Sequence, residues 1–165
     1  MTVGNLSLPE SFKIVDLTAG PVTTNGGVTG DYVSLKNVHK AWIVLQFTQA
    51  VAHATVVQPQ VATAVAPTGA TSITFATRIW SNEATATTDT LVAQTAATSY
   101  SLTADVAKKQ VIIEIDPGEV VAMGATYDVI GCTISNSAQA TNFVSGQYFL
   151  EMKYQQATPP AAITD

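Results

Sequence analysis

The segment DYVSLKNVHKAWIVLQF, residues 31–47, leads from a polar stretch into the strongest apolar run of the chain. Its apolar part is rich in β-branched and aromatic residues, and its side chains alternate with a period of two, which is typical of a β-strand. One face would carry Ile43, Leu45 and Phe47, and the other Trp42, Val44 and Gln46. The segment therefore predicts a long core strand and favours a β fold.

Five further segments have strand character, and clusters of Gly, Pro, Asn and Asp separate them. They are residues 54–65, 71–81, 110–116, 126–135 and 146–156. Short strands with alternating faces and turn-rich connections indicate antiparallel pairing rather than a parallel α/β sheet. We therefore predict an all-β fold: an antiparallel β-sandwich that is jelly-roll-like, with extended N- and C-terminal arms.

Individual residues add detail to the predicted strands. Pro59 has no backbone N–H, so it predicts an edge strand or a bend within residues 54–65. The alternation in residues 71–81 indicates one continuous strand. Cys132 falls on the same strand face as its apolar neighbours, which predicts a buried, unreactive thiol.

Helix is expected only in short pieces. The segment after Asp116 predicts a helix of one or two turns, because Pro117 suits the first helical position and Gly124 suits the end. Residues 103–110 predict another short turn. Neither piece is long enough to change the all-β class.

The chain divides into an N-terminal arm at residues 1–30, a β-sandwich domain at residues 31–157 and an extended C-terminal tail at residues 158–165. The first part holds few alternating apolar positions, although SFKIVDL, residues 11–17, could form an edge strand. Two consecutive prolines keep the tail out of a central sheet. Such arms either lie on neighbouring subunits or fray as ordinary termini.

The composition is unusual in its low charge. Charged residues make up 12% of the chain and hydrophobic residues 47%, whereas charged residues supply about 25% of a typical globular protein. Charge usually keeps a free surface soluble. The surface is therefore either covered by partners or simply neutral and rich in Thr, Ser and Gln.

Charge and hydropathy argue against nucleic acid and membrane as partners. The net charge is −5 and the seven basic residues are scattered, whereas phosphate binding needs a stripe of Lys and Arg. The apolar runs fall short of the roughly 20 residues that span a bilayer, and the first residues lack the basic start of a signal peptide. We expect a soluble protein that folds in the cytosol.

No motif in the sequence indicates catalysis or a bound cofactor. Only His39 and His53 could supply an imidazole, and no serine lies in a nucleophile elbow. The spacings that bind zinc or calcium are absent, and the outward carboxylates of residues 110–116 are ordinary solvated groups. We expect no catalytic residue, no metal and no cofactor.

Two small groups of residues are candidates for a protein interface. Lys36, His39 and Lys40 form a local basic spot on an acidic chain, which could dock an acidic neighbour or mark only the polar entry to a strand. Arg78 and Trp80 share one strand face, and exposed Trp and Arg are typical of interface hot spots. The alternative for Trp80 is that a loop or an arm covers this face.

The order of segments resembles the capsid decoration, or cement, proteins of tailed bacteriophages, in their jelly-roll type. The resemblance is carried by residues 31–47, by VIIEIDPGEVVAMGATYDVIGCTIS at residues 111–135, and by GQYFLEMKYQQA at residues 146–157. It covers most of residues 31–157 and contains no catalytic motif. Lys153 stands where Arg is common in the closing strand of such proteins.

This resemblance implies a structural virion protein, made in the host cytoplasm and seated on the exterior of the capsid. It implies a homotrimer that bridges neighbouring subunits of the major capsid protein and stabilises the shell. The alternative function is a β-sandwich of a phage tail or adhesin that binds carbohydrate or a receptor. A shallow cluster of exposed aromatic side chains would favour that alternative.

Overall fold

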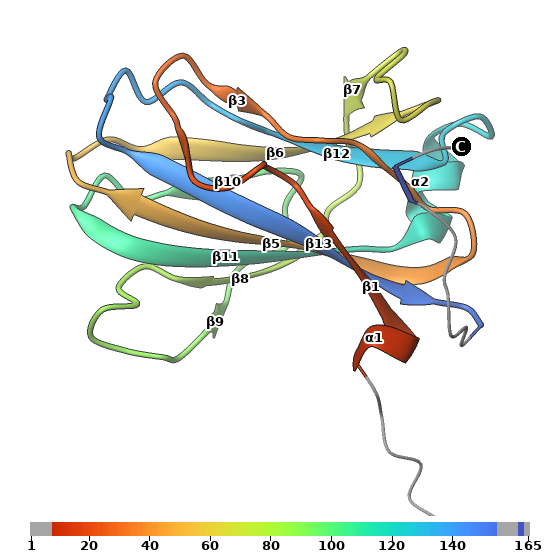
Figure 1. The fold of residues 1–165 in the computed structure, drawn as a ribbon, viewed down its shortest axis with the longest axis horizontal. Helices are drawn as coiled ribbons and strands as arrows, with labels where there is room; N and C mark the ends of the chain where they lie inside the picture. The colour runs from red at the N-terminus through yellow and green to blue at the C-terminus, as the bar shows by residue number, and fades with distance from the viewer. Residues whose placement is uncertain (1–7, 155–161, 164–165) are drawn as a thin grey trace, which may run out of the picture.

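Two antiparallel β-sheets pack face to face in a computed structural model that describes residues 8–154 and 162–163. Figure 1 views the two layers edge-on. The predicted all-β sandwich is therefore confirmed. No helix in the described ranges is both long enough and apolar enough to cross a membrane.

The sheets have seven and six strands. The larger sheet has the order β1 (Phe12–Asp16), β13 (Phe143–Met152), β5 (Val38–Gln49), β11 (Ala107–Ile115), β8 (Arg78–Asn82) and β9 (Val92–Ala93), with β2 (Val22–Thr23) beside β13. The smaller has the order β10 (Tyr100–Leu102), β6 (Thr55–Ala62), β12 (Val129–Ile134) and β3 (Val28–Thr29), with β4 (Val33–Ser34) beside β12 and β7 (Thr71–Ser72) beside β6. Two short helices, α1 (Leu8–Ser11) and α2 (Pro117–Met123), complete the described fold.

The core lies between the sheets and follows the predicted alternation. The inward side chains of β5, among them Ile43 and Leu45, are fully buried. They belong to one cluster with side chains of β12, including Ile130 and Cys132. Tyr148 of β13 is also buried, and its hydroxyl donates a hydrogen bond to the carbonyl oxygen of Asp31 at 2.7 Å.

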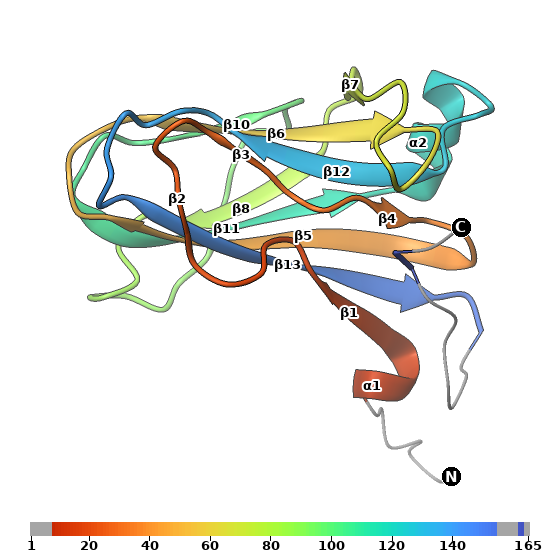
Figure 2. The ribbon, with the colours of Figure 1, turned by 45° about the horizontal axis from the view of Figure 1, so that its top comes forward.

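The N-terminal segment is built into both sheets. The strand predicted in residues 11–17 is present as β1 at the edge of the larger sheet. The chain then crosses the open side of the sandwich through β2 and joins the smaller sheet as β3, as Figure 2 shows. Leu17 lies at this crossing, where its backbone N–H donates to Gly146 of the larger sheet at 2.8 Å.

The C-terminal tail predicted at residues 158–165 lies mostly outside the described residues. Of this tail, the structure describes Ala162 and Ile163. The carbonyl oxygen of Ala162 accepts a hydrogen bond from the backbone N–H of Ser34 at 2.7 Å.

Two predictions about strands were wrong. Residues 71–81 do not form one strand, because β7 belongs to the smaller sheet and β8 to the larger. Ile73 and Ile79 are nevertheless both buried, so the period of two persists while the chain changes sheet. Residues 103–110 are not only a turn, because β11 begins at Ala107.

The prediction of an edge strand at Pro59 was also wrong. The proline lies within β6, which has β12 on one side and β10 and β7 on the other. Its carbonyl oxygen accepts from Ile73 N at 3.2 Å, in the gap between β10 and β7. The missing N–H points toward the same gap, so the proline interrupts no hydrogen bond of the β6–β12 ladder.

The short helix predicted after Asp116 is confirmed as α2. Pro117 is its first residue, and the Asp116 carboxylate accepts from the backbone N–H of Gly118 at 2.7 Å. Gly124 follows as the C-cap. An N-cap carboxylate and a proline at the first position both favour a helix start.

A buried ion pair ties the two sheets together at one end of the sandwich. The Lys109 side chain is 0% exposed, and its Nζ lies 2.9 Å from Glu83 Oε2. The ammonium also donates to the Thr103 carbonyl oxygen at 2.8 Å and to Thr103 Oγ1 at 2.7 Å. The Tyr100 hydroxyl of the other sheet donates to Glu83 Oε1 at 2.7 Å. All three ammonium protons therefore have acceptors.

We predict that Lys109→Met destabilises the protein by about 3 kcal/mol, because it leaves the Glu83 carboxylate without its cation. Chemical denaturation followed by circular dichroism measures the change. The matched control is Lys108→Met, which removes an exposed lysine from the neighbouring position and should change the free energy of unfolding by less than about 0.5 kcal/mol. Equal effects of the two substitutions would contradict this role of Lys109.

Candidate functional site

The solvent-facing side of the seven-stranded sheet, here called the outer face, carries side chains in rows that run across the strands. The register aligns Arg78, Glu114, Trp42 and Phe149 in one row. The next row holds Trp80, Ile112, Val44 and Gln147, and a third holds Gln110, Gln46 and Ser145. The face thus changes along the strands from charged and aromatic, through apolar, to uncharged polar.

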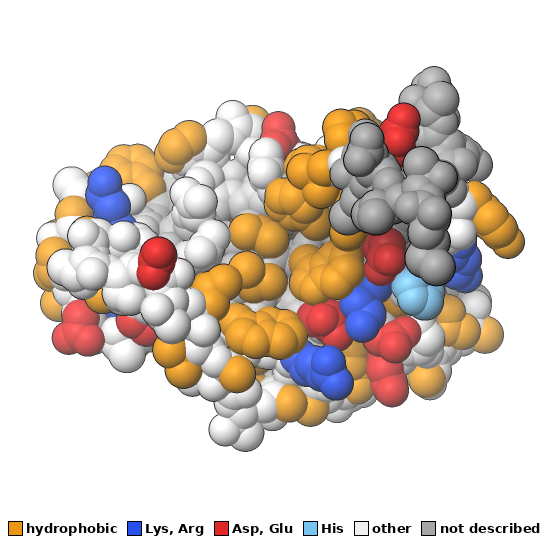
Figure 3. Space-filling model, turned by 90° about the horizontal axis from the view of Figure 1, so that it is seen from below, with side chains coloured by type: hydrophobic (Ala, Val, Ile, Leu, Met, Phe, Trp, Pro, Cys, Tyr) orange, Lys and Arg blue, Asp and Glu red, His pale blue; other side chains and the backbone are white. Residues whose placement is uncertain are grey.

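The centre of the outer face is an apolar hollow of about 750 Å³. Its eight lining residues are all apolar: Leu8, Phe12, Trp42, Val44, Trp80, Leu91, Ile112 and Phe149. Figure 3 shows hydrophobic side chains gathered in the middle of this face. Leu8 and Leu91 stand at its rim and are 48% and 37% exposed.

The aromatic side chains of the hollow hold one another in place. The rings of Phe12 and Trp42 have centroids 5.9 Å apart and are tilted by 53°, a favourable arrangement for an aromatic pair. The Trp42 indole N–H donates to Glu114 Oε2 at 3.3 Å. An aromatic surface held in this way loses little conformational entropy when a partner binds.

A charged cluster of Lys40, Arg78, Glu114, Asp116 and Glu119 borders the hollow. Lys40 Nζ lies 3.0 Å from Glu114 Oε1, and Arg78 Nη1 lies 3.9 Å from the same oxygen. Figure 3 shows basic and acidic side chains together beside the hydrophobic ones. The ion pair with Lys40 and the hydrogen bond from the Trp42 indole hold the Glu114 carboxylate in position.

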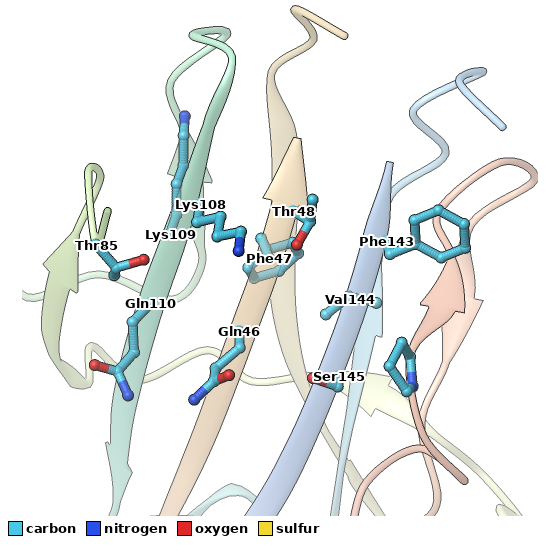
Figure 4. A pocket seen from close by; sticks show the side chains of 11 residues that line it. Gln46, Phe47, Thr48, Thr85, Lys108, Lys109, Gln110, Phe143, Val144 and Ser145 are labelled. Atoms are coloured by element: carbon cyan, nitrogen blue, oxygen red, sulfur yellow. The ribbon is translucent and has the colours of Figure 1, made fainter. Parts of the chain in front are cut away.

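Beyond the apolar hollow lies the amide row, formed by Gln110, Gln46 and Ser145, and the exposed Lys108 lies one row further along the same face. Figure 4 shows these side chains projecting from three neighbouring strands, with Phe143 at the start of β13. Two shallow hollows of about 360 Å³ each share Gln46 and Ser145 in their lining. The row therefore presents hydrogen-bonding groups next to the apolar hollow.

The structure brings three of the predicted interface residues together. Lys40 and Arg78 converge on Glu114, and Trp80 lines the adjoining hollow. Lys36 instead lies 3.9 Å from Asp128 Oδ2, and His39 is exposed beside an irregularity in the pairing of β5 with β13. Neither Lys36 nor His39 lines the hollow.

Sequence reasoning noted the two tryptophans but missed most of the hollow. Phe12, Ile112 and Phe149 line the hollow from outward positions of β1, β11 and β13. None of the three was singled out from the sequence. The alternation of side chains along each strand could have predicted that these residues lie on the outer face of the sheet. Leu8 and Leu91 lie outside the long strands, so no periodicity pointed to them.

Cys132 and the acidic residues give no sign of a reactive centre. Within residues 8–154 and 162–163, no group of three or more His, Cys, Asp or Glu side chains could hold a metal ion. Cys132 is completely buried, and this burial raises the pKa of its thiol to about 12. Burial also raises the pKa of Tyr148 well above its usual value.

Comparison of the chain with protein-family models, with curated protein sequences and with solved structures found no match. The function of the outer face must therefore be argued from its own geometry.

We predict that Cys132 does not react with a thiol reagent in the native protein at about pH 8.5, where half of free thiols are ionised. Denaturant should release one reactive thiol per chain, since the sequence has one cysteine. The folded pKa is raised, so the stability contributed by the neutral thiol is complete below the unfolded pKa and is lost as the pH rises toward 12. Rapid labelling without denaturant would contradict this burial.

Proposed function

We propose that this protein is a structural, non-catalytic component of a phage virion. It binds major capsid protein subunits on the outer surface of the capsid and stabilises the shell by bridging them. One observation carries the proposal: an all-apolar hollow with two tryptophans lies on an outer sheet face. The homotrimer implied by the sequence resemblance stays a prediction.

The layout of the outer face supports a protein partner. Protein interfaces combine an apolar centre, enriched in Trp and other aromatic residues, with a polar rim. Here the hollow supplies the centre, and the charged cluster and the amide row lie on either side of it. Arg78, with a side chain that is 73% exposed, stands next to Trp80 on the same strand face, and these two residue types dominate interface hot spots.

Carbohydrate binding is the second candidate function, because the face exposes aromatic rings beside amide groups. A sugar ring needs hydrogen-bond partners as well as an aromatic surface. The eight residues that line the hollow offer none from their side chains except the Trp indoles, and the Trp42 indole is already bonded to Glu114. The geometry of the hollow therefore favours a protein partner over a glycan.

The test is sedimentation of the purified protein with DNA-free shells of the major capsid protein from the same genome. Wild type should pellet with the shells and raise their thermal transition. Trp80→Ala should weaken shell binding by at least about tenfold, the loss of about 1.4 kcal/mol expected from an interface anchor.

The matched control is Tyr154→Ala, which removes a 66% exposed aromatic side chain that does not line the hollow. This variant should bind shells as wild type does. If wild type leaves the shells in the supernatant but is retained by an immobilised glycan, the capsid function is wrong and the second candidate is favoured.

A further inference from the structure

One of the two shallow hollows beside the amide row, here called the polar hollow, extends the outer face beyond the apolar hollow. It has a volume of about 360 Å³. The register aligns a further row next to the amide row, formed by Lys108, Thr48 and Phe143. Both rows line the polar hollow, and Figure 4 shows the Lys108 side chain reaching from β11 toward β5. Side chains from three strands therefore converge on this end of the face.

The polar side chains of this hollow have no partner within the part of the chain that the structure describes. None of the five makes a side-chain hydrogen bond or an ion pair there: Lys108, Thr48, Gln110, Gln46 and Ser145. Together they carry an ammonium, two amides and two hydroxyls, all of which can donate hydrogen bonds. These donors are therefore available to a binding partner.

The polar hollow has one accessible charge, the ammonium of Lys108. Its lining contains no Asp or Glu. Lys109 also contributes to the lining, but its side chain is 0% exposed and is paired with Glu83. On a chain with a net charge of −5, this hollow is therefore a local positive site that matches a single negative charge.

We propose that the polar hollow receives an Asp or Glu side chain of the capsid subunit whose apolar surface fills the apolar hollow. This inference rests on the proposed function, and it names the chemistry of the partner at one end of the interface. The Lys108 ammonium forms a charge-assisted hydrogen bond with the carboxylate. The Thr48 hydroxyl and the glutamine amides donate to its remaining lone pairs.

A phosphate group fits this hollow less well than a carboxylate does. Proteins that bind nucleic acid place several Lys and Arg side chains along the phosphates. Here Lys108 is the single accessible cation among the described residues of the lining. One ammonium surrounded by uncharged donors suits the single charge of an Asp or Glu side chain.

The fold fixes the position of Lys108. Its neighbour Lys109 points inward to Glu83, and successive side chains of a strand point to opposite faces, so Lys108 points outward. The Lys108 carbonyl oxygen accepts a hydrogen bond from the backbone N–H of Thr85 at 2.9 Å. Because the backbone is already ordered, binding has to order only the side chain, which limits the entropic cost.

One capsid surface can reach both hollows. Lys108 lies four residues along β11 from Ile112, which lines the apolar hollow, and this separation is about 14 Å at 3.4 Å per residue. A standard interface buries about 800 Å² on each partner, so it is roughly 30 Å across. Lys108 therefore lies at the rim of such an interface, where a charge affects the rate of association and its salt dependence.

The test compares binding of the full chain and its variants to DNA-free capsid shells by sedimentation. Lys108→Met should weaken binding about tenfold at low salt, because it removes a hydrogen bond to a charged group. The difference should shrink at about 1 M salt, where screening acts within about 3 Å. Lys108→Arg keeps the positive charge and should bind within about threefold of wild type.

The matched control is Lys153→Met, which changes the net charge equally and removes an exposed lysine that lines neither hollow. It should bind shells as wild type does. Chemical denaturation establishes that both methionine variants are as stable as wild type, so that weaker binding is not a loss of fold.

Shells whose carboxylates have been amidated with a carbodiimide and ethanolamine test the chemistry of the partner. Electron microscopy establishes that these shells remain intact. Amidation should remove the difference in binding between wild type and Lys108→Met, because no carboxylate is left for Lys108 to bind.

Equal binding of wild type and Lys108→Met to native shells would refute the inference and leave the capsid function standing. A tenfold difference that persists on amidated shells would also refute it, since the group that meets Lys108 would not be a carboxylate. Wild type that binds no shell at all would refute the capsid function and, with it, this inference.

Discussion

The structure depends on the alternation of β5 at the centre of the larger sheet. Antiparallel partners in register flank this strand on both sides, β13 and β11. Successive side chains of a strand point to opposite faces, so a single register fixes both surfaces of the sheet. Ile43 and Leu45 are thereby committed to the core, while Trp42 and Val44 are committed to the outer face. A slip of one residue would exchange the two sets.

The sequence was sufficient to predict the class of fold and the inward faces of the long strands. Period-two alternation with turn-rich connections predicted the sandwich. Pro117 as a first helical residue and Gly124 as a helix end predicted α2. The sheet to which each strand belongs was not predictable, as residues 71–81 show, because alternation records burial and not the pairing partner. The hollow was missed for a related reason: its lining residues come from α1, from five strands and from the segment just before β9, and only the fold brings them together.

The outer face combines rigidity with incomplete coverage. Burial of its opposite side in the core, and the ion pairs of Glu114 with Lys40 and Arg78, hold its side chains in position. Within the described residues no second layer lies over the hollow, although two tryptophans and two phenylalanines line it. A soluble monomer rarely leaves such a contiguous apolar patch without a use. Binding of another protein surface is the physical role that this combination favours.

The most direct measurement of the central claim uses the two tryptophans, because they are the only ones in the chain and both line the hollow. Acrylamide quenching of their fluorescence should be recorded from dilute to concentrated protein, and again with capsid shells added. If the outer face is a protein interface, quenching falls and the emission shifts to shorter wavelength as partners assemble. Unchanged quenching and emission, in samples whose mass shows that assembly has occurred, would place the interface elsewhere and contradict the account.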